Sequence, residues 1–130
     1  AEAMAFADYV RSERNRSAIY NNMVAFFETF DVLACPVNGL APLPVEIEYP
    51  TEVAGRPMRD YIDWLQFAFP ASVAGLPAMS LPVGFTPSGM PVGLQLIGPP
   101  RGEGRLLQIA HMFEQALALP VTVIDPRPPT

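Results

Sequence analysis

The sequence predicts an α/β protein in which helices flank a mixed sheet, and three observations support this prediction. Segments at both ends of the chain place apolar residues three to four positions apart, as amphipathic helices do. Residues 78–83 and 91–97 are short, apolar and joined by a turn sequence, which is typical of a β-hairpin. The chain has 130 residues, so it is large enough to bury one core.

The N-terminal part, residues 1–35, is expected to form a helix and then a strand. It contains no proline and no glycine, and a helix is predicted to end near Thr29. Its apolar stripe consists of Ile19, Met23, Phe26, Phe27 and Phe30. The apolar segment 31–35 is predicted to be a buried strand, which Pro36 stops.

Residues 36–57 are predicted to be a long surface loop. Five prolines and two glycines leave this segment unable to sustain a helix or a central strand. Loops of this length are usually functional or disordered. The segment is therefore either the rim of a binding cleft or a loose connection, and the sequence favours neither.

Residues 58–119 should form the core from a helix, the hairpin and a second helix. The first helix is expected over residues 59–68, where Pro70 ends or kinks it. The hairpin turn should lie within residues 84–90, around Pro87-Ser88-Gly89. Pro82 and Pro91 lack an N–H group, so each must lie at a strand end, an edge or a bulge.

The second helix is predicted over residues 103–117. Its apolar stripe consists of Leu106, Ile109, Ala110, Phe113 and Leu117. The tail, residues 120–130, contains four prolines and is expected to be an extended strap or disordered.

Composition excludes several classes of protein. The net charge is −5 and the eight basic residues, all arginine, are dispersed, so nucleic acid is not an expected partner. No apolar run is long enough for a membrane span, and the N-terminus does not resemble a signal peptide. The single cysteine, Cys35, cannot form an internal disulfide, which fits the cytoplasm.

Apolar residues are slightly over-represented. When glycine is counted and tyrosine is not, their share exceeds the usual ~45–50% of a soluble domain. We therefore expect an exposed apolar face that binds a missing lobe of the same protein or a second copy in a homodimer.

Glycine and proline recur in a distinctive order through the hairpin. Gly75 allows a backbone turn that a side chain would hinder, and Gly93 within an apolar strand predicts close approach of another backbone. The whole run, residues 69–98, is FPASVAGLPAMSLPVGFTPSGMPVGLQLIG. It resembles the closing segment of amidase-signature hydrolases, and Phe26-Phe27 with residues 31–36 is more weakly similar to that family.

The resemblance implies a serine hydrolase that cleaves amide bonds without a metal or an organic cofactor. In the family an upstream lysine activates a bridging serine, which relays protons to a nucleophilic serine. This chain has no lysine, and none of its five serines lies in a glycine-rich serine loop, so no catalytic residue is assigned. The chain also does not begin with Met, and we expect a C-terminal fragment whose partner is the missing N-terminal catalytic lobe.

Tyr61, Trp64 and Phe67 are spaced along one helical segment. Aromatic residues in this pattern usually pack in a core. The resemblance instead implies that Tyr61 and Trp64 line the pocket for a small-molecule substrate, an aromatic or aliphatic amide.

Other sites are weakly supported. Ser80, His111 and Asp63 could form a triad only through a geometry that sequence does not reveal, and His111 lies off the apolar stripe. One histidine and one distant cysteine do not suffice for a zinc site. Residues 98–104 lack the Gly-Lys-Ser/Thr ending of a phosphate loop and are expected to be a turn.

Three alternatives to a catalytic fragment remain open. The chain could be a degenerate homologue, a non-catalytic interaction subunit, or part of the amidase subunit of a tRNA-dependent amidotransferase, which has the same motifs.

Overall fold

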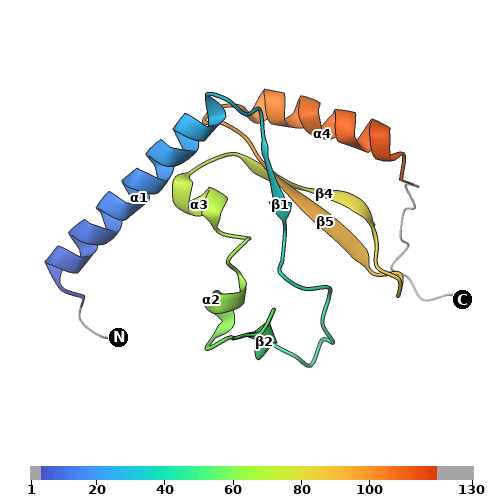
Figure 1. Ribbon diagram of the computed structural model, residues 1–130, viewed down its shortest axis with the longest axis horizontal. Coiled ribbons are helices and arrows are strands. Elements are labelled where there is room, and N and C mark those ends of the chain that lie inside the picture. The colour runs from blue at the N-terminus through green and yellow to red at the C-terminus, as the bar shows by residue number, and fades with distance from the viewer. Residues whose placement is uncertain (1–3, 120–130) are drawn as a thin grey trace, which may run out of the picture.

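The computed structural model describes residues 4–119, in which helices lie on both faces of a small sheet (Figure 1). The elements, in chain order, are α1 (Phe6–Phe27), β1 (Leu33–Pro36), β2 (Glu52–Val53), β3 (Arg56–Pro57), α2 (Tyr61–Trp64), α3 (Pro70–Ala74), β4 (Ala78–Phe85), β5 (Pro91–Ile97) and α4 (Glu103–Leu117). This arrangement confirms the predicted α/β class.

The predicted hairpin is present and forms most of the main sheet. Its strand order is β1-β5-β4, and both pairings are antiparallel, so β5 lies in the centre. The register shifts between Pro82 and Gly84, which places Pro82 at a bulge, and Pro91 is the first residue of its strand. Both prolines thus occupy positions that do not require an N–H donor.

Two apolar clusters pack on opposite faces of this sheet, because neighbouring residues of a strand point to opposite sides. Ile97 of β5 packs with Ala71, Ala74 and Leu76, and Met23 and Phe27 of α1 lie against them. Leu96 packs on the other face with Leu81, Leu106 and Ala110, the last two from α4. The sheet is therefore the middle of three layers.

The first helix was predicted to within two residues at its C-terminal end, but its surroundings differ from the prediction. Met23 and Phe27 contact the core, whereas Ile19 and Phe30 of the same predicted stripe are largely exposed. The N-terminal half of α1 projects away from the sheet (Figure 1). The following strand, β1, is not fully buried as expected: within residues 4–119 it lies at a sheet edge and alternates between half-buried and exposed positions.

The single helix predicted over residues 59–68 is wrong. α2 ends at Trp64, and a separate helix, α3, begins at Pro70. Proline cannot supply an N–H to a helix interior, but the first helical position does not need one. Gly75 ends α3 with φ of 66°, the left-handed conformation that its lack of a side chain favours.

Residues 36–57 contain no helix, as predicted, but they include a minimal hairpin of β2 and β3. Its two turn residues, Ala54 and Gly55, have φ of 50° and 77°. Positive φ at both positions is the type I′ turn that matches strand twist. The segment is otherwise mostly exposed, which confirms the predicted surface loop.

The C-terminal helix, α4, has the predicted bounds. Leu106 and Ala110 are buried, while Phe113 and Leu117 at its far end remain more than one-third exposed. The predicted tail lies outside the described residues.

Candidate functional site

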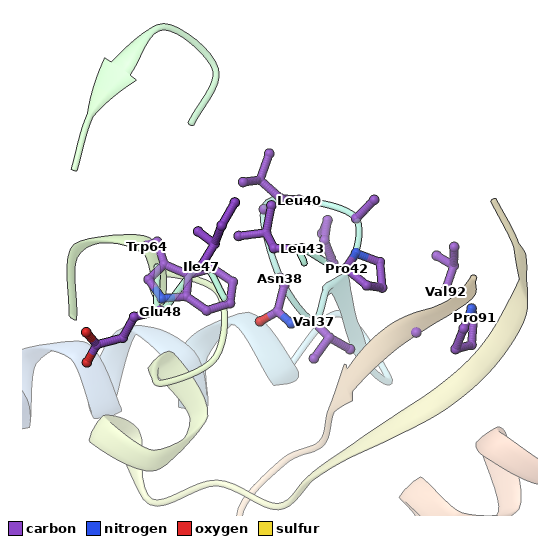
Figure 2. A pocket seen from close by; sticks show the side chains of 14 residues that line it. Val37, Asn38, Leu40, Pro42, Leu43, Ile47, Glu48, Trp64, Pro91 and Val92 are labelled. Carbon is purple, nitrogen blue, oxygen red and sulfur yellow. The ribbon is translucent and has the colours of Figure 1, made fainter. Parts of the chain in front are cut away.

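A hollow of about 470 Å³ lies where the loop after β1 meets the start of β5. Its lining comprises residues 36–43, Ile47, Glu48, Trp64 and residues 91–93. Figure 2 shows the Trp64 ring and Ile47 on one side, Pro91 and Val92 on the other, and Val37 and Asn38 between them. The loop predicted as either a cleft rim or a loose connection thus contributes most of this hollow.

Gly93 leaves room at this site that no other residue would. A Cβ atom on Gly93 would lie 2.9 Å from Ser80 Oγ and 3.1 Å from Val37 Cγ2. The sequence predicted close approach of another backbone here, and that is wrong: the groups that approach are side chains of the two neighbouring strand segments.

Trp64 is half-buried and forms a wall of the hollow. Its Nε1 atom is buried and has no hydrogen-bond acceptor among the described residues. Tyr61, grouped with it from sequence, is 45% exposed and is not among the lining residues. Its ring instead meets Trp64 edge to face, with centroids 6.0 Å apart, so Tyr61 supports Trp64 from outside.

The hollow is mainly apolar. Asn38 directs its amide toward the Trp64 side, whereas the Glu48 carboxylate points outward (Figure 2). Glu48 is the one charged residue among the described residues of the lining. The lining offers shape, apolar surface and one amide, but no nucleophile paired with a base.

Sequence reasoning missed Gln95, a buried polar residue in the centre of the sheet. It is only 8% exposed. Its Nε2 donates to Phe67 O at 2.6 Å and also lies 3.2 Å from Cys35 Sγ. The signal available in the sequence was a single amide within the otherwise apolar segment PVGLQLI, because a polar side chain is kept in a core only with partners.

Polar contacts at the N-terminus of α2 fix its start. Asp60 Oδ1 accepts from the backbone N–H groups of Ile62 and Asp63, as a helix cap does. Arg59 Nε and Nη2 each lie 2.8 Å from an oxygen of Asp63, and the Arg59 backbone N–H donates to it at 3.0 Å. These donors hold the pKa of Asp63 well below its usual range.

Asp63 is therefore expected to stay ionised in the folded protein well below pH ~3.9, its usual pKa. Since the folded pKa is the lower one, the pair's contribution to stability is complete above the unfolded pKa and is lost as pH falls through the folded value. Arg59→Ala should raise the pKa toward ~3.9, as followed by carboxyl ¹³C NMR. Arg56→Ala, which removes only a weaker attraction, should raise it less; equal titration in the two variants would contradict the assignment.

The triad considered from sequence is not assembled among the described residues. His111 is exposed on α4, where its ring Nε2 lies 3.0 Å from Gln115 Nε2 and its Nδ1 lies 3.8 Å from Glu114. Asp63 is engaged by Arg59, and Ser80 lies on β4. Residues 4–119 also include no cluster of three potential metal ligands.

Two further features bear on the site's surroundings. Residues 98–104 form the predicted turn between β5 and α4, where Leu106 N donates to Gly102 O at 2.9 Å. Among the described helices, none combines the length and apolar character needed to cross a bilayer.

Apolar side chains are exposed on both outer helices, as the composition predicted. Phe6 and Tyr9 on α1 and Leu107 and Met112 on α4 are each more than half exposed. Surfaces of this kind commonly mark contact areas.

Comparisons with known proteins agree with this architecture. A family model described as Amidase matches residues 1–107. A putative amidase of Synechocystis sp. is 37% identical over 110 residues, 85% of this chain but 22% of that protein. The glutamyl-tRNA(Gln) amidotransferase of Moorella thermoacetica contains a subunit that is 42% identical over 110 residues, covering 85% of this chain and 21% of that protein.

Among solved structures, a bacterial aryl acylamidase of the amidase signature enzymes has a similar fold. The TM-score is 0.78 at 22% sequence identity, and the match covers 88% of this chain and 24% of that one. The chain therefore spans about a fifth to a quarter of the length of these relatives.

Proposed function

Because this chain belongs to the amidase family, we propose that it is the C-terminal part of an amide-bond hydrolase of the serine–serine–lysine type. It contributes strands and one wall of the substrate pocket. The two serines and the lysine lie in the rest of the enzyme, since this chain has no lysine. The missing catalytic lobe covers the exposed apolar sides of α1 and α4, which would otherwise associate in a homodimer.

The observation that carries this proposal is a hollow that has a binding wall but no catalytic group. Its lining is mainly apolar, with Trp64 on one side and Gly93 in the floor. Apolar walls with few polar groups suit the body of a small organic ligand. The substrate proposed is an aromatic or aliphatic amide that contacts Trp64, with Tyr61 supporting that ring.

No metal or organic cofactor is part of the proposed mechanism, because serine and lysine side chains can supply the nucleophile and the base. We place the enzyme in the cytoplasm, where the single cysteine would stay reduced.

A second candidate is part of a tRNA-dependent amidotransferase. The 42% identity to the Moorella thermoacetica protein favours it. In that case the enzyme would act on an amide within a larger assembly. A non-catalytic subunit or degenerate homologue would conserve the packing without the reaction.

The natural gene product tests these proposals directly. We expect its intact mass to exceed that of 130 residues severalfold and its purified form to hydrolyse carboxamides. Residues 1–130 alone should release no ammonia or amine above the level of Ser72→Ala and Ser80→Ala controls. Turnover by residues 1–130 that survives both substitutions would contradict the proposal, and glutamine hydrolysis only in an assembly with charged tRNA would favour the amidotransferase.

In the active natural enzyme, Trp64→Ala is expected to raise KM for an aromatic amide about tenfold or more, because it removes an apolar wall. Tyr61→Ala, which leaves the lining intact, should raise KM less. Steady-state kinetics with both variants measure this difference, and equal KM values in Trp64→Ala and the parent enzyme would exclude Trp64 from the pocket.

A further inference from the structure

Trp64 does not fix its own position at the hollow. Its Nε1 group has no acceptor within the described residues, so the polar end of the indole is not tethered. The helix that carries it, α2, has four residues. A helix this short is not stable by itself and takes its position from its neighbours.

The contacts at the start of α2 are local. The Asp60 cap and the Arg59–Asp63 pair join residues no more than four positions apart. They define the shape of α2, but they do not connect it to the sheet.

Gln95 makes that connection. Its Nε2 donates to Phe67 O at 2.6 Å, across 28 residues of sequence. Phe67 lies three residues after Trp64, in the turn between α2 and α3. A hydrogen bond of this length from a buried amide to a backbone carbonyl holds the turn against the sheet.

Gln95 is itself held firmly. It lies within the central strand β5, paired with Cys35 on one side and Ser80 on the other. Side chains two positions apart in a strand point to the same face. Ile97 in the core, Gln95 and Gly93 in the hollow therefore follow one another along a single face of β5.

From this order we propose that Gln95 is a positioning residue, which sets the place of Trp64 at the hollow through the carbonyl of Phe67. The inference rests on the proposed function for its kinetic consequence. The positional claim concerns residues of this chain alone.

The test uses the natural protein with Gln95→Met, which keeps the size of the side chain and removes the donor. Gln95→Asn withdraws the amide by one methylene and serves if the Met variant does not fold. Gln66→Leu is the matched control, because Gln66 is exposed on the same turn. The readouts are KM and kcat for an anilide and for a short aliphatic amide, and the indole N–H resonance that disappears in Trp64→Phe.

We expect Gln95→Met to raise KM for the anilide about tenfold, with kcat within twofold and the short amide affected less. The Trp64 resonance should shift, and Gln66→Leu should change neither readout. In a Trp64→Ala background, Gln95→Met should have no further effect on KM, because the residue it positions is gone.

An unchanged Trp64 resonance in a folded Gln95 variant would overturn the proposal, as would a KM effect that adds in full to that of Trp64→Ala. If the parent protein hydrolyses neither amide, the proposed function fails, and the resonance still decides the role of Gln95.

Discussion

Leu106→Ala is expected to destabilise the protein by about 2–5 kcal/mol. Leu106 is 4% exposed and joins α4 to the sheet through Leu81 and Leu96. Removing its isobutyl group loses the transfer free energy of burial and leaves a cavity that the two neighbouring leucines cannot fill without moving. The change is measured as the free energy of unfolding in urea.

The adjacent residue provides a matched control. Leu107 is 61% exposed on the same helix, so Leu107→Ala should change stability by no more than about 0.5 kcal/mol. Both substitutions alter helix propensity equally, and only burial differs. Similar losses in the two variants would mean that α4 does not pack on this sheet through the Leu106 face.

Gly93→Ala is expected to destabilise the protein by about 1–3 kcal/mol, which is typical of an overpacked site. The added methyl would lie 2.9 Å from Ser80 Oγ and 3.1 Å from Val37 Cγ2, so at least one neighbour must move. Ser80→Ala removes the closer atom and should recover part of the loss in the double variant. Thermal unfolding of the single and double variants measures this recovery.

Gly104→Ala should have the opposite sign. Gly104 lies in the first turn of α4, and a Cβ there would meet no atom within 4 Å. Alanine is the better helix former, so a gain of up to about 1 kcal/mol is expected. If Gly93→Ala were also stabilising, the close contacts at the floor of the hollow would be incorrect.

The elements with strong local signals were predictable from sequence. Residues 103–117 repeat their apolar residues at helical spacing, and the observed helix has the same bounds. The hairpin was equally clear because Pro82 and Pro91 restricted where its strands could bend. In both cases the information lies within some fifteen residues of the element itself.

Features that depend on distant residues could not be predicted in the same way. Pro70 fits both the end of one helix and the first position of the next, and the choice depends on packing of α3 against Ile97. The separation of Trp64 from Tyr61 depends on where residues 36–48 lie. The Gln95 contact joins two segments 28 residues apart, and local periodicity carries no information about such pairs.

Both outer strands of the main sheet, β1 and β4, have one unpaired side in the described part of the chain. Natural sheets commonly protect such sides with charged residues, lysine above all, against recruitment of strands from other molecules. Neither LACP nor AMSLPVGF contains a charged residue. Pro36, Pro82 and the bulge beside Pro82 are therefore the features that oppose fibril-like growth along these strands.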